Sequence, residues 1–128
     1  MNTLQWIDAR SVEEAVALLS APGPQGATIA KAGGLDLLDL MKEGILAPAR
    51  IVNLQRIDAL RGVDFSESAG LRIGALTTLA DIANDATIRR RYPALAAAAA
   101  HAATAQIRNA ATIGGNLLQR PRCWYFRH

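Results

Sequence analysis

A pair of glycines separates two short apolar runs in the stretch Ala27-Thr28-Ile29-Ala30-Lys31-Ala32-Gly33-Gly34-Leu35-Asp36-Leu37-Leu38. The run before the glycines predicts a buried strand over residues 27–32, and the run after them predicts a short buried helix that ends at Gly44. Residues 50–54 predict the next strand. Together these elements make a β-α-β unit, in which the glycines form the turn from strand to helix.

A second pair of glycines lies much further along the chain, in Ala111-Thr112-Ile113-Gly114-Gly115-Asn116-Leu117. Glycine has no Cβ atom, so the backbone at such a pair can come close to a ligand. Two loops of this kind, from distant parts of one chain, can hold the two sides of one pyrophosphate. Together they predict a dinucleotide site, with FAD as the favoured ligand. The sequence contains no G-x-G-x-x-G fingerprint, which argues against a Rossmann fold.

The composition is that of a globular domain. The chain has 128 residues, of which 51% are hydrophobic and 20% are charged, as expected for one domain with its own core. It lacks an apolar stretch of the roughly 18 residues that a membrane-spanning helix needs, and residues 1–8 do not resemble a secretory signal. The single Cys123 excludes an internal disulfide framework. We therefore expect a cytoplasmic protein without a membrane span.

The formal net charge of +3 is unevenly distributed. Arginines occupy residues 89–91, and further arginines lie in the last quarter of the chain, at Arg108, Arg120, Arg122 and Arg127. A nucleic-acid surface would need a basic stripe with interleaved aromatic residues, which the sequence does not show, so we expect no nucleic-acid partner. The excess positive charge suits an anionic cofactor or an acidic partner subunit.

Capping residues and apolar spacing predict the other elements. These are a helix from the capping box Ser11–Glu14 to about Ser20, a strand over residues 71–75, a helix over residues 79–84 capped by Thr77 or Thr78, and a helix that opens at Pro93 and continues through the alanine-rich residues 94–105.

Three stretches of the sequence resemble the N-terminal part of the FAD-binding medium subunit of molybdenum hydroxylases. That family includes xanthine dehydrogenases, carbon monoxide dehydrogenases and bacterial aldehyde oxidoreductases. The stretches are Ala32–Leu37, Leu71–Thr78 and, as the most specific, Gln106–Leu117. The match covers essentially the whole chain in order and spacing. It implies an α/β (α+β) FAD-binding domain of the two-loop, non-Rossmann type (vanillyl-alcohol-oxidase/PCMH-like), here truncated. Residues 1–128 would form its N-terminal part, with a first β-α-β subdomain at 1–56 and the start of a second α/β subdomain at 57–128.

The resemblance also implies a set of cofactor-binding residues, in which glycines allow close approach, Thr112 and Asn116 donate hydrogen bonds and Lys31 adds positive charge. They are Lys31, Ala32, Gly33, Gly34, Leu35, Asp36, Leu37, Ala111, Thr112, Gly114, Gly115 and Asn116. Family members usually carry a hydroxyl residue at the position of Leu35, so this chain lacks one hydrogen bond to a phosphate. A hydrogen bond to a charged group is worth about 1.5–3 kcal/mol, and its loss would weaken cofactor binding by that amount. The sequence shows no arrangement of nucleophile and base, so we expect no catalytic residue and assign any chemistry to the flavin.

In the family, FAD relays electrons from iron–sulfur clusters to an external acceptor. The resemblance thus implies two partners, a large molybdenum-binding subunit with molybdopterin and a small iron–sulfur subunit. The tail Arg122–Arg127 looks like the start of an insertion in which cysteines hold a four-iron–four-sulfur cluster. Such a cluster needs four cysteines, so Cys123 would be a metal ligand only in a longer chain.

Two other functions remain open at this point. The chain could be a truncated, non-catalytic remnant or docking fragment that binds no flavin, which Leu35 and the end at His128 favour. Alternatively, it could be a general nucleotide- or phosphate-binding module, which predicts that ADP binds as well as FAD.

Overall fold

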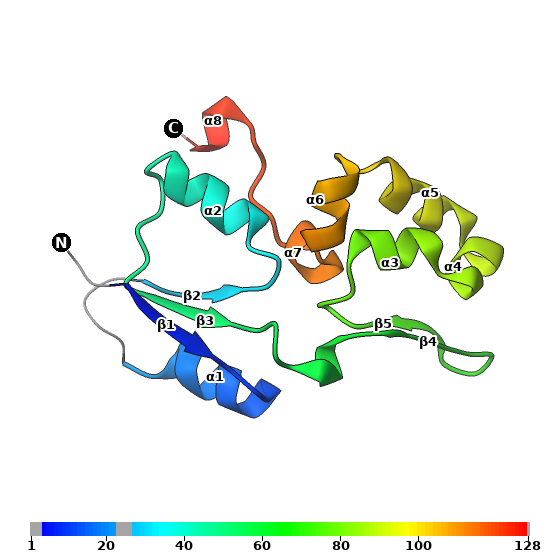
Figure 1. The fold of residues 1–128 in the computed structure, drawn as a ribbon, viewed down its shortest axis with the longest axis horizontal. Coiled ribbons are helices and arrows are strands. Elements are labelled where there is room, and N and C mark those ends of the chain that lie inside the picture. The colour runs from blue at the N-terminus through cyan, green and yellow to red at the C-terminus, as the bar shows by residue number, and fades with distance from the viewer. Residues whose placement is uncertain (1–3, 23–26, 128) are drawn as a thin grey trace.

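The computed structural model describes residues 4–22 and 27–127, which form two parts joined by a short connection (Figure 1). The first part is a parallel sheet with the strand order β1-β3-β2. Its strands are β1 (Gln5–Asp8), β2 (Thr28–Lys31) and β3 (Arg50–Asn53). Helix α1 (Val12–Ser20) lies on one side of this sheet and α2 (Leu35–Lys42) on the other (Figure 1). Both faces are thus covered, as is usual for parallel sheets.

The second part combines an antiparallel hairpin with a group of short helices on one side of it (Figure 1). The 3-10 helix η1 (Asp58–Leu60) leads into the hairpin, formed by β4 (Val63–Ser66) and β5 (Gly70–Ile73). The helices are α3 (Leu79–Asn84), α4 (Ala86–Arg91), α5 (Pro93–His101), α6 (Ala105–Ala110) and α7 (Ile113–Leu117). After α7 the chain returns toward the first part, where α8 (Trp124–Arg127) lies on the α2 side (Figure 1).

The β-α-β unit predicted around the first glycine pair is confirmed. Strands β2 and β3 pair in parallel, with Thr28 opposite Arg50. Gly34, with φ of 87°, makes the turn into α2, and Gly44, with φ of 72°, follows the end of that helix. Both are left-handed conformations that glycine adopts without steric cost.

The predicted helix caps are also present. The Ser11 hydroxyl accepts a hydrogen bond from the Glu14 N–H at 3.0 Å. Of the two threonines that could cap α3, Thr78 does so, because it forms a reciprocal capping box with Asp81. Thr77 instead donates its hydroxyl proton to the carbonyl of Gly62.

The alanine-rich helix is shorter than predicted, because α5 ends at His101 and not at residue 105. Ala102 is extended and Ala103 has a φ of 48°. The Arg108 guanidinium donates to the carbonyls of Ala102 and Ala103 at 3.1 and 2.8 Å, which stabilises the turn. The next helix, α6, then begins at its Thr104 cap. A turn held by side-chain hydrogen bonds from Arg108, five and six residues further on, therefore overrides the helix propensity of alanine.

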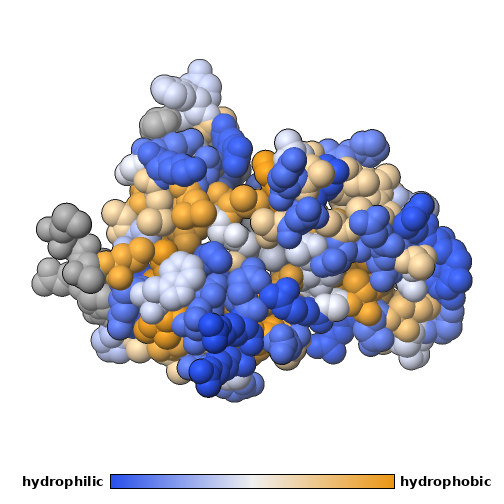
Figure 2. Space-filling view, viewed as in Figure 1, coloured by the Kyte–Doolittle hydropathy of each residue, from blue (hydrophilic) through white to orange (hydrophobic). Residues whose placement is uncertain are grey.

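Separate apolar clusters stabilise the two parts. The helices of the second part enclose Leu79, Ile82, Ile88, Ala96 and Ala99. In the first part the buried cluster is formed by Ala9, Ala15, Val52 and Ile57. Outside these clusters, hydrophobic residues are visible on the α2 side of the boundary between the parts (Figure 2). That boundary is where the candidate site lies.

Replacing Ile82 with alanine tests the core of the second part. Ile82 is fully buried, so Ile82→Ala is expected to lower the free energy of unfolding by about 2–5 kcal/mol. Val16→Ala in α1 removes apolar atoms from a residue that is 56% exposed, and we expect a change within about 0.5 kcal/mol. Denaturant unfolding followed by circular dichroism measures both. Equal losses in the two variants would contradict the assignment of this core.

Candidate functional site

A groove of about 810 Å³ lies between the two parts, within the size range of ligand pockets. The start of α2, the turn between α6 and α7 and the segment after α7 contribute to its walls. The structure brings to this groove all the cofactor-binding residues implied by the resemblance. They are Lys31, Ala32, Gly33, Gly34, Leu35, Asp36, Leu37, Ala111, Thr112, Gly114, Gly115 and Asn116. Their contacts with a cofactor stay predictions.

The first glycine loop leaves backbone donors available at the start of α2. The N-cap of this helix is Gly34, which has no side chain to accept a hydrogen bond. By contrast, side chains cap α1, α3, α4, α6 and α7. Within the described residues, no hydrogen bond from the N–H groups of Gly34, Leu35 or Leu37 is found. Since unpaired donors and the helix dipole both favour negative charge, this end of the groove suits an anion.

The second glycine loop uses its backbone donors internally. The N–H groups of Ile113 and Gly114 donate to the carbonyls of Thr77 and Ala75, each at 2.9 Å. The Gly115 N–H donates to the Thr112 hydroxyl at 3.3 Å, and the Asn116 N–H donates to a main-chain carbonyl. The two loops therefore differ, because most main-chain donors of the second loop are already paired within the described part of the protein.

Two of the glycines are required by packing between backbone segments. A Cβ atom on Gly33 would overlap the carbonyl oxygen of Ala110, and one on Gly114 would lie 2.9 Å from the carbonyl oxygen of Ala75. Gly115 is less constrained, since its Cβ would lie 3.1 Å from the Thr112 hydroxyl. The close approach that the sequence predicts for a ligand is thus also an approach of the two loops to each other.

Lys31 belongs to a polar network at the carboxyl ends of the three parallel strands. Asp8, Asn53 and Lys31 lie opposite one another on β1, β3 and β2. The Lys31 ammonium donates to Asn53 Oδ1 at 3.3 Å and lies 5.4 Å from the centre of the Trp6 ring. Asn53 in turn donates to Asp8 at 2.7 Å. Hydrogen bonds from Asn53 and Trp6 hold the pKa of the Asp8 carboxyl below its ordinary value. The network fixes the Lys31 chain beneath Gly34, whose Cβ would lie 2.8 Å from Lys31 Cε.

The segment after α7 also lines the groove, which the sequence did not predict. It contributes Leu118, Gln119, Arg120 and Arg122. The Arg120 N–H donates to Asp36 Oδ2 at 3.2 Å, and the Arg122 guanidinium lies 3.3 Å from Asp39 Oδ2. The C-terminal arginines were the one feature of the sequence that could have indicated this role. No local sequence pattern, however, predicts that this segment contacts α2.

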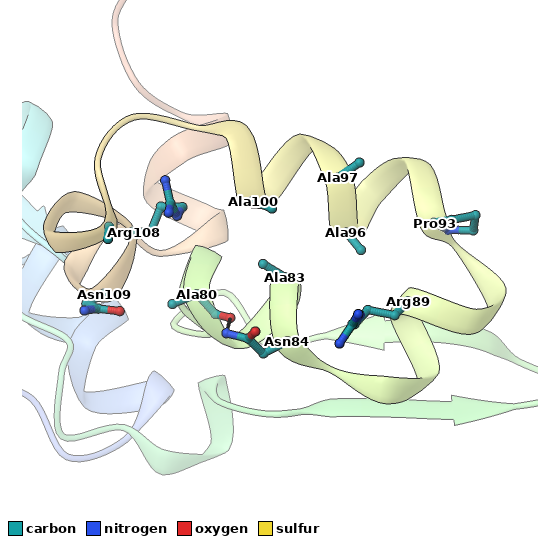
Figure 3. Close-up of a pocket in the computed structure, with 11 residues that line it drawn as sticks. Ala80, Ala83, Asn84, Arg89, Pro93, Ala96, Ala97, Ala100, Arg108 and Asn109 are labelled. Atoms are coloured by element: carbon teal, nitrogen blue, oxygen red, sulfur yellow. Dashed lines mark hydrogen bonds between the residues drawn. The ribbon is translucent and has the colours of Figure 1, made fainter.

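Another groove, of about 550 Å³, lies between α3, α5 and α6 (Figure 3). Alanines form much of its wall, among them Ala83 and Ala96, while Asn84, Arg89 and Arg108 provide polar groups. None of the predicted cofactor-binding residues lines it.

Cys123 is exposed. In residues 4–22 and 27–127, no group of three or more His, Cys, Asp or Glu side chains is placed to hold a metal ion. The iron–sulfur role of Cys123 therefore stays a prediction for a longer chain. The same part of the chain contains no helix long and apolar enough to cross a membrane.

Comparison with known sequences finds relatives that are named for FAD binding. A family model described as the FAD binding domain in molybdopterin dehydrogenase matches residues 2–122. The aldehyde oxidoreductase FAD-binding subunit PaoB of Escherichia coli (strain K12) is 44% identical over 112 residues, which cover 88% of this chain and 35% of that subunit. The carbon monoxide dehydrogenase medium chain of Hydrogenophaga pseudoflava is 39% identical over 108 residues, or 84% of this chain and 37% of that one.

Comparison with solved structures finds similar folds in related enzymes. Carbon monoxide dehydrogenase from Hydrogenophaga pseudoflava superposes with a TM-score of 0.82 at 37% identity, over 89% of this chain and 39% of that chain. Quinoline 2-oxidoreductase from Pseudomonas putida 86 gives a TM-score of 0.80 at 28% identity, over 90% and 39% of the two chains. This chain thus spans little more than a third of the proteins it matches. The resemblance and the mixed α/β fold of this type of FAD-binding domain, both predicted from the sequence, are confirmed. The chain belongs to the family of FAD-binding domains of molybdopterin dehydrogenases.

Proposed function

We propose that this chain binds FAD in the groove between its two parts and serves in the flavin subunit of a cytoplasmic molybdenum hydroxylase. When bound, FAD would supply the redox chemistry that relays electrons from iron–sulfur clusters to an external acceptor. We further propose that the partners are a large molybdenum-binding subunit, which holds molybdopterin, and a small iron–sulfur subunit. The relatives are named as an FAD-binding subunit and a medium chain, which supports a place in such an assembly.

The start of α2 is the observation that carries the proposal. Gly34 is a buried residue whose N–H has no hydrogen-bond partner within the described residues, and a buried donor left unpaired costs about 1–3 kcal/mol. A diphosphate placed there would accept from this group and from the N–H groups of Leu35 and Leu37. The walls of the groove also include apolar side chains such as Leu35, Leu76 and Ile107, which suit the uncharged parts of a dinucleotide. The residues present therefore fit the cofactor of the family.

A docking fragment that binds no flavin is the second candidate. Leu117 and Leu118 are 76% and 85% exposed, and Leu118 lines the groove. Apolar side chains exposed in this way favour a surface that another polypeptide covers. Titration of the purified chain with FAD separates the two candidates, because the docking fragment predicts no saturable change in flavin fluorescence.

Leu35→Thr tests the position of the diphosphate. The new hydroxyl would stand in the first turn of α2 and supply the hydrogen bond that family members usually have, so we expect the Kd for FAD to fall about tenfold. Leu38→Thr makes the same replacement on the same helix at a residue that is 50% exposed, and should leave the Kd within twofold. Flavin fluorescence titration measures both. An unchanged Kd in Leu35→Thr would place the diphosphate elsewhere.

Glycine substitutions test the packing of the two loops against each other in the absence of a ligand. Gly33→Ala places a Cβ against the Ala110 carbonyl, so we expect it to lower the free energy of unfolding by about 1–3 kcal/mol without any ligand. Gly115→Ala lies within α7, where the gain in helix propensity offsets its mild contact, and should stay within about 1 kcal/mol of the parent. Urea unfolding without flavin measures both. If Gly33→Ala is as stable as the parent, the two loops do not pack as described.

A further inference from the structure

The segment after α7 forms a strap across one side of the groove, which we define as residues 119–122. It is attached to α2 at two points. The Arg120 main-chain N–H donates to Asp36 Oδ2 at 3.2 Å, and the Arg122 guanidinium pairs with Asp39 Oδ2 at 3.3 Å. Asp36 and Asp39 are three residues apart on the helix, so they lie on one face. The strap therefore joins the second loop to the helix that follows the first loop (Figure 1).

The cationic residues that line the groove differ in the contacts of their side chains. They are Lys31, Arg120 and Arg122. Lys31 donates to Asn53 and lies over the Trp6 ring, and Arg122 pairs with Asp39. The Arg120 guanidinium makes no salt bridge or hydrogen bond within residues 4–22 and 27–127, since its one hydrogen bond there uses the main-chain N–H. Of these three residues, Arg120 therefore has the charged group that is available to a ligand.

We propose that Arg120 is a phosphate-binding residue of this groove and that Asp36 is a positioning residue that holds the strap in place. The proposal rests on the proposed function, with the diphosphate of FAD as the anion. Main-chain N–H groups at the start of α2 supply neutral donors, whereas a guanidinium adds a full charge and a planar pair of donors that match two phosphate oxygens. Asp36 then contributes to binding although its own charge repels the ligand.

Titration of the complete 128-residue chain with FAD and with ADP at low and high salt tests the role of Arg120. Arg120→Gln should raise the Kd for both ligands by roughly ten- to a hundredfold and flatten the salt dependence. Arg120→Lys should recover part of the loss. Arg90→Gln removes the same charge from an exposed residue of α4 and should stay within twofold. Thermal unfolding of each variant controls for folding.

Asp36 variants provide the sharper test. Asp36→Ala removes a negative charge from the groove, so simple electrostatics predicts tighter binding of ADP, whereas loss of the strap contact predicts binding weaker by about threefold or more. Asp36→Asn retains an acceptor oxygen for the Arg120 N–H and should restore at least the parent affinity. Tighter binding in Asp36→Ala would overturn the positioning role.

The outcomes also separate this inference from the proposed function. If the parent chain binds FAD and Arg120→Gln binds it equally well, the role of Arg120 is wrong and the proposed function stands. If the parent binds ADP but not FAD, and Arg120→Gln weakens ADP binding, the phosphate role stands and the flavin function fails. If the parent binds neither ligand, both are overturned.

Discussion

The contact between Gly33 and the carbonyl of Ala110 is the constraint on which the groove depends. Each glycine loop belongs to a different part of the molecule, and the absence of a Cβ atom lets the two backbones touch. Any other residue at position 33 would push the parts away from each other and widen the groove. The internal hydrogen bonds of residues 113–116 then hold the second loop rigid against this contact. One glycine thus fixes the distance between the two walls of the candidate site.

The two loops would contribute unequally to the binding of an anion. Within the described residues, the first loop presents the N–H groups of Gly34, Leu35 and Leu37 without hydrogen-bond partners, and no side chain caps the helix there. Most N–H groups of the second loop are paired internally, with Ala75, Thr77 and Thr112, so this loop would contribute mainly shape. Positive charge comes from Lys31 beneath Gly34 and from the strap. A site built in this way is preorganised, because its donors require no rearrangement to meet a phosphate.

Local signals in the sequence predicted the elements that local physics controls. The strand, turn and helix around Gly34, and the caps at Ser11 and Thr78, depend on residues within a few positions of each other. By contrast, β1 is largely exposed or half-buried and is held by pairing with β3 across the chain. The strap depends on Asp36, which is 84 residues from Arg120. Such contacts join distant residues without a periodic pattern, so a single sequence could not predict them. The end of α5 depends on Arg108, only five or six residues away, but through side-chain hydrogen bonds that helix propensity does not predict.

The residues in each of these contacts are far apart along the chain, which has a consequence for how the molecule folds. Gly33 meets Ala110, and Asp36 meets Arg120, so the groove exists only after most of the chain has been ordered. Closing loops of this length costs entropy before any contact is formed, which makes them late events in folding. A ligand seated between the two walls would act as a cross-link, because it binds the assembled state alone. Its binding free energy would then be added to the stability of the whole fold.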